Sequence, residues 1–434
     1  MRALLLAYYF PPDGGPGAQR PIAFARHLPA HGVDVTVLTR HPPAARGIYD
    51  PADPAPLAAL EPGCRIARTP AAAAGPVAVA SAMVGTGSAL LRAERHDVVL
   101  ATMSPFELAD PALELGERHD VPVVFDLRDP WALDGVQSHR TWWHGRRARA
   151  RMRRRLRGCA GLVVNTPECV GLFRREAPWL PAERVVAITN GWDAAEFAPP
   201  APLVEPGPKL TLLHAGTFLC GELYAHERPL RRWLGWLRWS AESIAPAGRT
   251  PQPLLAALAS LRANGSAAGR EVRLRCVGMV DAALQRCVAE SGVADAVELV
   301  PYRPHATLLA ELRAADALFL TLHGLSPGAR SRIVPGKTYE YLASGRPILA
   351  GLPPGDARDF VAASPRAFVA DPCDAPGLAF QLERLHAAWR RGEFRGAAMP
   401  PWLAACERRA LAGRLATFLG DVVAGFRPRL RRGS

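Results

Sequence analysis

Several residue patterns that mark common enzyme classes are missing from this sequence of 434 residues. It contains no D-x-D pair of aspartates, which is the usual carboxylate site for a metal-bound diphosphate. It also contains no Walker loop, which argues against the P-loop NTPase class. We therefore expect no catalytic metal and no resident cofactor.

Paired cysteines and long hydrophobic runs are also scarce. The eight cysteines form no C-x-x-C pair and several stand in apolar strand-like runs, which predicts buried, reduced thiols in a reducing compartment. The opening apolar run, residues 3–10, is too short for a signal-peptide core and is expected to be a strand. One uncharged window, residues 71–91, approaches membrane-spanning length, but it is rich in small residues and contains Pro76, so a packed or membrane-touching helix is expected. These features predict a cytoplasmic protein.

Lysine is nearly absent, since Lys209 and Lys337 are the only two among 53 basic residues. Such a bias towards arginine indicates a GC-rich bacterial genome, so the formal charge of +13 does not by itself predict a nucleic-acid partner. Placement is more informative. Residues 146–157 include eight arginines directly behind Trp142 and Trp143, and residues 427–432 include four more. These patches predict contact with an anionic surface, lipid or polymer, or else a solvated helix face.

Strand-like apolar runs alternate with helix-length segments along both halves of the chain. This alternation predicts parallel sheets covered by helices on both faces, which is an α/β fold. A proline-rich interval interrupts it before it restarts, so we expect two Rossmann-like domains, at residues 1–197 and 209–400, a linker at 198–208 and a C-terminal segment at 401–434. The expected strands are residues 3–9, 33–38, 97–101, 121–125, 161–165, 185–189, 209–214, 272–277, 297–301, 317–322 and 347–351.

The loop after the first expected strand is rich in glycine and reads YFPPDGGPGAQR over residues 9–20. Gly14, Gly15 and Gly17 permit backbone conformations and close approaches that side chains would prevent. A helix beginning near Arg20 would direct amide hydrogens at an anion. The loop is either a phosphate or substrate site or an ordinary loop that contains glycines.

Charged residues follow another buried strand, where the chain reads FDLRDPW over residues 125–131. Ligands of open α/β sheets bind at the carboxyl ends of strands, and two aspartates with an arginine offer hydroxyl activation and anion contact. We predict Arg128 and Asp129 as catalytic residues. The alternative is structural, with Asp126 paired to Arg128 or Asp129 capping a helix.

The densest set of candidate site residues lies in residues 331–347, SRIVPGKTYEYLASGRP. Pro335 and Gly336 would begin a helix that Gly345 ends, which places Lys337 and Glu340 on one face. A helix amino end with a lysine suits a diphosphate, and a carboxylate one turn later suits a ribose diol. A lysine in a chain so rich in arginine indicates that a compact ammonium is needed here. The alternative is a surface Lys–Glu pair on a helix.

Together these segments resemble glycosyltransferase family 4, a retaining, metal-independent group with the GT-B fold of two Rossmann-like domains that face a central cleft. The resemblance covers nearly the whole chain, because YFPPDGGPGAQR, FDLRDPW, ITNGWDAAEF (residues 188–197), LHAGTF (213–218) and VPGKTYEYLASGRPILA (334–350) occur in the family's order. It implies transfer of a sugar from a nucleotide diphosphate donor, of UDP or GDP type, to a hydroxyl acceptor. A lipid-linked acceptor, a peripheral position on the inner face of the membrane and a role in cell-surface polysaccharide or glycoconjugate biosynthesis are the associated expectations.

The resemblance also assigns donor-binding residues. Gly14 and Gly15 of the first loop would approach the donor phosphates, and Lys337 and Arg249 would meet the diphosphate. Glu340, also expected in catalysis, would hold the ribose. It further implies that the last helix, about residues 407–426, returns to the first domain. The full donor-binding set is Gly14, Gly15, Arg20, Asn190, Gly216, Thr217, Arg249, Gly278, Tyr302, Arg332, Gly336, Lys337 and Glu340.

Two features depart from the family's pattern. Arg332 stands eight residues before Glu340, where the family often carries the first of two glutamates, and this leaves the donor sugar open. An insertion at about residues 219–248 places Trp233, Trp236 and Trp239 three residues apart among arginines. The insertion is expected either to dock on a membrane or lipid-linked acceptor or to pack on the second domain.

Two other functions stay open at this point. One is a sugar-nucleotide epimerase on the same fold, which needs no acceptor. The other is a catalytically silent binding subunit, which the missing first glutamate favours. Nucleic-acid binding is not expected, since the basic runs lack the aromatic interleaving of a recognised module.

Overall fold

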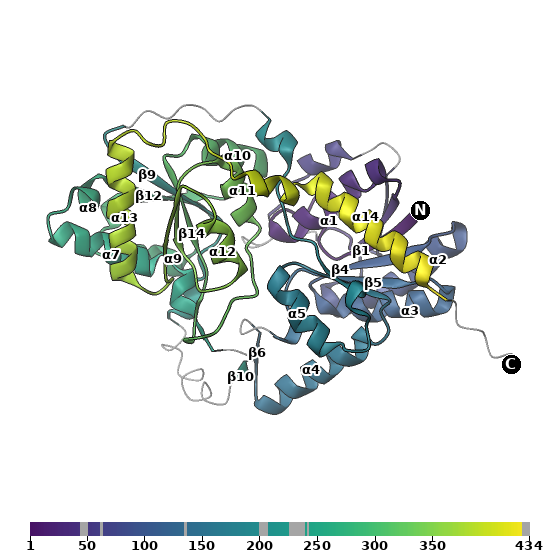
Figure 1. Cartoon of the computed structure of the whole chain (residues 1–434). Coiled ribbons are helices and arrows are strands. Elements are labelled where there is room, and N and C mark those ends of the chain that lie inside the picture. The colour runs from purple at the N-terminus through teal and green to yellow at the C-terminus, as the bar shows by residue number, and fades with distance from the viewer. Residues whose placement is uncertain are drawn as a thin grey trace, which may run out of the picture. The chain divides into compact units, whose positions relative to one another are not determined.

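The chain forms two compact units in the computed structural model, which describes residues 1–43, 51–60, 64–133, 137–198, 207–224, 239–240 and 243–427 (Figure 1). Unit 1 comprises Met1–Asp134, Arg146–Gly191 and Ala405–Ser434, and unit 2 comprises Gly135–Gly145 and Trp192–Ala404. Unit 1 is therefore built from both ends of the chain, whereas most of unit 2 is one continuous stretch.

Unit 1 has a parallel sheet of seven strands in the order β3-β2-β1-β4-β5-β7-β8. In that order the strands are Arg65–Arg68, Asp34–Thr39, Arg2–Ala7, Val98–Met103, Val123–Leu127, Gly161–Val164 and Val185–Ala187. The helices are α1 (Pro16–His27), α2 (Gly75–Ala93), α3 (Ala109–His119), α5 (Pro167–Glu176), α14 (Arg408–Gly425) and most of α4 (Trp142–Leu156), whose first four residues belong to unit 2.

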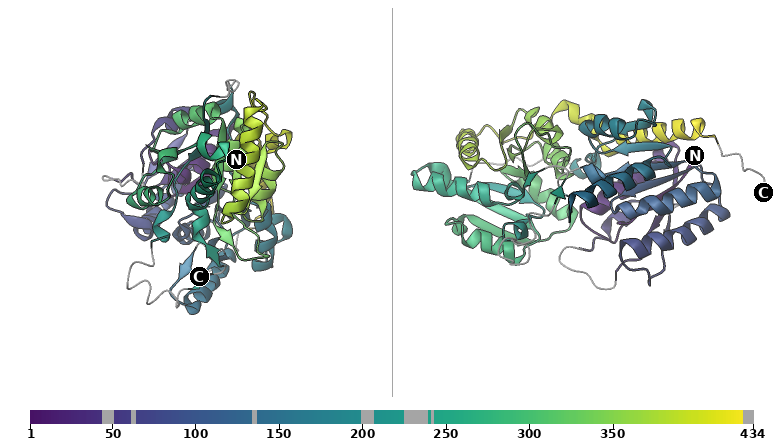
Figure 2. Two further views of the ribbon diagram at one scale, coloured as in Figure 1. Left: turned by 90° about the vertical axis from the view of Figure 1, so that its left-hand side faces the viewer. Right: turned by 90° about the horizontal axis from the view of Figure 1, so that it is seen from below.

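Alternate residues of the central strand β1 enter two separate cores in unit 1. Leu4 and Leu6 pack in a cluster with side chains of α2, α3 and α5, whereas Ala3 and Leu5 pack in another with α1 and α14. Figure 2 shows helices on both faces of this sheet. Burial on both faces explains why the strands are nearly continuous apolar runs.

Helix α2 is the one helix in the described part of the chain whose length and hydropathy would suffice to cross a membrane. Of its most apolar window, 33% is buried, and Val79, Met83 and Leu90 belong to the core beside α3. Core helices of globular domains meet the same criterion of length and composition, so this helix is weak evidence for a span.

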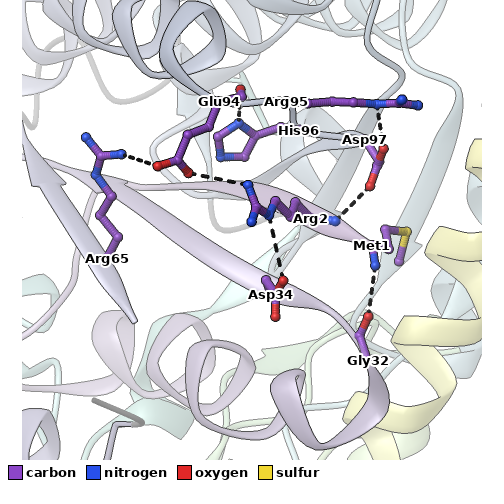
Figure 3. A network of polar contacts seen from close by, with 9 residues as sticks. All are labelled: Met1, Arg2, Gly32, Asp34, Arg65, Glu94, Arg95, His96 and Asp97. Carbon is purple, nitrogen blue, oxygen red and sulfur yellow. Dashed lines mark hydrogen bonds and ion pairs between the residues drawn. The ribbon is translucent and has the colours of Figure 1, made fainter. Parts of the chain in front are cut away.

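Polar contacts fasten the amino ends of neighbouring strands in unit 1 (Figure 3). The backbone N–H of Arg2 donates to Asp97 Oδ2 at 2.8 Å, and the Arg2 guanidinium lies 3.8 Å from Asp34 and 3.7 Å from Glu94. Arg65 also donates to Glu94, at 3.1 Å. These pairs are solvent-exposed, so each contributes little to stability. They lie at the amino ends of the strands, away from the carboxyl ends.

Unit 2 has a second parallel sheet, of six strands in the order β13-β12-β9-β14-β16-β17. In that order they are Val297–Pro301, Val272–Gly278, Leu210–Ala215, Ala317–Thr321, Ile348–Gly351 and Ala367–Ala370. The helices are α7 (Gln252–Ala263), α8 (Ala267–Glu271), α9 (Ala282–Ala289), α10 (His305–Ala314), α11 (Lys337–Ser344), α12 (Asp356–Ala362) and α13 (Ala375–Arg390). Two Rossmann-like α/β sheets are thus confirmed, as the sequence predicts.

Two short antiparallel pairs complete unit 2. Strand β6 (Ser138–His139) pairs with β10 (Trp239–Ser240), and β11 (Ile244–Ala245) pairs with β15 (Gly324–Leu325). The Trp239 ring packs on Gly145, where a Cβ would come within 2.1 Å of the indole, and stacks near His139. Trp233 and Trp236 of the insertion, most of the expected linker at residues 198–208 and the basic tail from residue 428 lie outside the described residues.

Helix α14 belongs to unit 1. Leu411, Leu415, Leu419 and Val422 are buried in the core that contains Ala3 and Leu5 of β1, and Figure 1 shows α14 beside α1. The segment just before α14 packs closely against Gly191, because a Cβ on Gly191 would lie 2.4 Å from Cys406 O.

Candidate functional site

Two glycines at the carboxyl ends of neighbouring strands make room for a lysine in unit 2. Gly216 follows β9 with a φ of +114°, and a Cβ there would lie 3.0 Å from Lys337 Nζ. Gly278 ends β12, and a Cβ there would lie 2.2 Å from the carbonyl oxygen of Gly216. Glycine is therefore favoured at Gly216 by its positive φ and by the nearby ammonium, and at Gly278 because a side chain there would displace the backbone of Gly216.

The Lys337 ammonium is held by two acceptors from β9. Its Nζ donates to Ala215 O at 2.6 Å and lies 3.3 Å from His214 Nε2. The other ring nitrogen, His214 Nδ1, lies 2.9 Å from Phe319 O, and because a carbonyl can only accept, Nδ1 carries the proton. Nε2 then accepts from Lys337. Two of the three N–H donors of the ammonium are thus engaged within unit 2.

His214 is kept neutral by its surroundings. The ring is buried and stacks on Phe218, with 3.9 Å between centroids and 15° between planes. Burial, together with the positive charge of Lys337, holds the pKa of His214 well below its ordinary value. A neutral imidazole can accept a hydrogen bond from the lysine, which an imidazolium could not do.

Positive charge accumulates around this lysine. Burial and the nearby Arg249 lower the pKa of Lys337 to about 7, in spite of the opposing influence of Glu340 and Cys276. Burial and the same arginine lower the pKa of His323, which follows β14, to about 4. The repelling charges near neutral pH are those of Arg249 and Lys337, so an anion bound beside them would relieve this repulsion.

Glu340 lies one turn into α11 and is 9% exposed. His305, the first residue of α10, stands between it and a second carboxylate, with Nε2 at 3.7 Å from Glu340 Oε1 and 3.4 Å from Glu196 Oε1. The next residue, Tyr341, fastens α11 to the sheet because its hydroxyl accepts from Ala215 N at 2.8 Å.

The remaining predicted donor residues of unit 2 lie on or next to α11, β9, β13 and a short 3-10 helix. Gly336 is the N-cap of α11, and Gly345, with a φ of +65°, ends the helix as predicted. Thr217 directly follows Gly216, Tyr302 directly follows β13, and Arg332 lies in the segment before α11; all three are partly buried. Arg249 ends a short 3-10 helix, Pro246–Arg249, whose last carbonyl accepts from Leu219 N.

In unit 1, Arg20 has a structural role. Its guanidinium forms a buried ion pair with Asp126 and also donates to Ile188 O and Thr189 O, each at 2.8 Å. Arg20 is 4% exposed and Asp126 is fully buried. The Arg20 guanidinium is thus engaged within the protein, and its contact with the donor stays a prediction. Asp126 pairs with Arg20 instead of with Arg128.

Arg128 is likewise engaged by the protein. Its three guanidinium nitrogens donate to Met103 O, Gly17 O and Ser104 O, and these bonds connect the end of β4 and the residue after it with the first turn of α1. Burial lowers the pKa of Arg128, while Asp129 and Asp126 act in the opposite direction. These bonds position the Arg128 guanidinium, and its catalytic role stays a prediction. Asp129, partly buried beside it, stays a predicted catalytic residue.

The glycine-rich loop of unit 1 is anchored by backbone contacts. Gly14 N donates to Pro51 O at 2.8 Å, and Gly15, with a φ of +78°, is the N-cap of α1. Asp13 before them is buried in an ion pair with Arg40. Asn190 is partly exposed and lies near the end of the second chain segment of unit 1, Arg146–Gly191. The donor roles of Gly14, Gly15 and Asn190 stay predictions.

Metal ligands form no cluster in the residues that the structure describes, where no group of three or more His, Cys, Asp or Glu could hold an ion. The positive side chains around Lys337 are instead suited to an anion. Three histidines next to the predicted residues, His214, His305 and His323, were not found from the sequence. For His214 the available signal was its place next to the end of a largely apolar strand, LTLLHA.

Two family models match the chain. The glycosyl transferase 4-like domain matches residues 18–191, and the glycosyl transferases group 1 domain matches residues 248–388, within unit 2. The chain belongs to the glycosyltransferase 4-like proteins. This glycosyltransferase accordingly acts with a nucleotide-sugar donor, and the second match contains Arg249, Lys337 and Glu340.

Solved structures share the fold of this glycosyltransferase across nearly its whole length. Sucrose-phosphate synthase from Thermosynechococcus elongatus has a TM-score of 0.67 and 15% sequence identity, covering 98% of this chain and 99% of that chain. Anabaena HepE in complex with UDP-glucose has a TM-score of 0.53 and 15% identity, covering 98% of each chain. UDP-GlcNAc 2-epimerase from Neisseria meningitidis, bound to UDP-GlcNAc, has a TM-score of 0.56 and 11% identity, covering 98% of this chain and 100% of that chain. These likenesses confirm the GT-B fold, while comparison with curated protein sequences gives no match.

Proposed function

We propose that this glycosyltransferase moves a sugar from a nucleotide diphosphate donor to a hydroxyl acceptor, with retained anomeric configuration and without a metal ion. The observation that carries the donor part is the placement of Lys337. Two of its N–H donors are fixed on β9, so the third is available to a phosphate oxygen beside Gly216 and Gly278, where no side chain intervenes.

The charge of the leaving diphosphate is the central electrostatic demand of the reaction. Lys337 and Arg249 supply positive charge at the amino end of α11, and groups fixed before the reaction stabilise developing charge effectively. These cations occupy the role that a divalent metal plays in other transferases, which supports the proposal of metal independence. Retention is proposed from the resemblance to family 4, and Asp129 is the proposed contact of the acceptor hydroxyl.

The identity of the substrates is proposed more broadly. We take UDP as the first nucleotide to test, with GDP as the other, since HepE was solved with UDP-glucose and belongs to the same fold. A lipid-linked acceptor, a peripheral position on the inner face of the membrane and a role in cell-surface polysaccharide or glycoconjugate synthesis complete the proposal. An epimerase would interconvert donors without acceptor, and a silent subunit would bind nucleotide without releasing any, so product analysis with and without acceptor separates all three.

Glu340→Gln is expected to weaken binding of the nucleotide diphosphate roughly 10- to 100-fold, because hydrogen bonds to a charged group contribute about 1.5 to 3 kcal/mol. The measurement is thermal stabilisation by UDP, GDP and their sugars in the presence of EDTA. Glu114→Gln serves as the matched control, since Glu114 forms an exposed ion pair with Arg118 in unit 1. Equal stabilisation of both variants by the same nucleotide would contradict the proposed role of Glu340.

Affinity for a sugar nucleotide is expected to fall as the pH rises above about 7. The protonated form of Lys337 binds the diphosphate, and its pKa in the free protein is about 7. Below that pH the proton is already present, whereas above it the complex must take up a proton, so Kd rises by up to about tenfold per pH unit. Titration calorimetry with a sugar nucleotide tests this, because the diester diphosphate keeps its charge over the same range. In Lys337→Met the dependence should disappear.

A further inference from the structure

Helix α4 carries many arginines and no acidic residue. Its arginines differ according to the side of the helix on which they lie. Met152 and Leu156 are buried and belong to the core of unit 1, which identifies the inner side. Arg149 and Arg153 are paired with Glu176, and Arg155 is paired with Asp110. The inner side and its flanks are therefore electrostatically compensated.

The outer side of α4 has no compensating acidic side chain among the residues that the structure describes. Trp143, Arg147, Arg151 and Arg154 follow one another at spacings of four, four and three residues, which aligns them along one face of a helix. All four are exposed, and the Trp143 side chain is 68% exposed. Among the described residues, the three arginines have no acidic partner within ion-pair distance. Like charges at these spacings destabilise a helix, so a surface of opposite charge would stabilise this face.

The aromatic pair at the start of the helix indicates the nature of that surface. Trp142 and Trp143 are 44% and 68% exposed and contact each other edge to face, with centroids 5.0 Å apart. Indoles concentrate at membrane interfaces, where the ring meets hydrocarbon and the N–H meets water. A straight face with arginines along it and indoles at one end fits a flat anionic bilayer, whereas a nucleic acid offers no hydrocarbon layer for the two rings.

We propose that the outer face of α4, defined by Trp143, Arg147, Arg151 and Arg154, binds a bilayer of anionic phospholipid. The inference deepens the proposed peripheral position of the protein, because it assigns that position to one surface. It does not depend on the predicted donor residues, because none of them lies on α4. The bound lipid is recognised by charge and by the interfacial region, and no single headgroup is required.

The test uses the full chain and vesicles of phosphatidylcholine, with or without phosphatidylglycerol, in flotation without nucleotide. A variant combining Arg147→Gln, Arg151→Gln and Arg154→Gln should lose roughly 100-fold in partitioning onto anionic vesicles, since each basic residue near such a surface contributes about a factor of five. The matched control combines Arg175→Gln, Arg303→Gln and Arg409→Gln, which are exposed and scattered, so that net charge is equal. Trp143→Ala should weaken partitioning on its own.

The result that supports the proposal is binding to anionic vesicles that high salt weakens, that the α4 variant loses and that the control keeps. Equal binding of the two triple variants would overturn it, because net charge would then explain the effect. Failure of the wild-type chain to bind anionic vesicles would also overturn it, as would binding to RNA or DNA in place of vesicles. Stabilisation of the same α4 variant by nucleotide shows independently that it is folded and whether the donor site works.

Discussion

Replacing Lys337 by methionine is expected to lower kcat for sugar transfer by about 10²- to 10³-fold, the usual effect of removing one fixed donor from a developing charge. Methionine fills the space beside Gly216 without a charge, so Ala215 O and His214 Nε2 lose their shared donor. The measurement is release of nucleotide diphosphate from a sugar nucleotide in the presence of acceptor. Undiminished kcat in this variant would remove Lys337 from the mechanism.

Lys337→Arg provides the informative comparison. A guanidinium keeps the charge, but its planar fork does not fit the compact position between two acceptors on one strand. We expect it to restore little activity. Substantial rescue would show that charge alone matters at this position.

The methionine variant should also be at least as stable as the wild type at neutral pH. The pKa of Lys337 is lowered to about 7 in the folded protein, so burial of its charged form destabilises the fold below that pH. This disadvantage diminishes as the pH rises from about 7 towards the ordinary pKa of lysine. Thermal unfolding at several pH values therefore separates loss of chemistry from loss of fold, and a variant that melts far below wild type at neutral pH would contradict this account.

Removing the carboxylate of Asp126 is expected to destabilise unit 1 by about 3 to 5 kcal/mol, because it leaves the buried guanidinium of Arg20 uncompensated. Hydrogen exchange of β1 and β5 in Asp126→Asn measures the effect within this unit, and a single unfolding free energy for the whole chain is not needed. The double variant Arg20→Met with Asp126→Leu should recover much of the loss, since apolar side chains often replace a buried pair without penalty.

An exposed pair gives the scale for comparison. Glu114→Gln removes the contact with Arg118, whose side chain is 56% exposed, and should change the same exchange by less than about 1 kcal/mol. If Asp126→Asn is as mild as Glu114→Gln, the Arg20 ion pair does not hold unit 1 together, and Arg20 would again be open to a ligand.

The central strands could be predicted from the sequence because burial on both faces makes them continuous apolar runs. The expected strands at residues 272–277 and 317–322 each differ by one residue from the central strands β12 and β14, and the edge strand β13, at 297–301, was predicted as well. The edge strands β3 and β17 were not predicted. β3 reads RIAR and has no fully buried residue, so solvent on its outer side removes the pattern on which the prediction depends.

The candidate site was predictable only where neighbours in sequence are neighbours in space. Lys337, Glu340 and Gly345 lie on one helix or at its end, so their spacing located α11. The partners that give these residues their chemistry come from far along the chain. His214 is 123 residues from Lys337, and Asp126 is 106 residues from Arg20. No periodicity encodes such pairs, and for this reason Arg20 was assigned to the donor although its partner is inside the protein.

The return of α14 to unit 1 has a consequence for the order in which the protein is made. During synthesis the first strands and α1 leave the ribosome early, but the core that contains Ala3, Leu5 and Val35 is completed only when Leu411, Leu415 and Leu419 have been translated. Unit 2, from Trp192 to Ala404, can complete its sheet before that point. The amino-terminal half therefore finishes folding last, contrary to the usual vectorial order, and a chain truncated just before α14 would leave that face of its sheet open to aggregation.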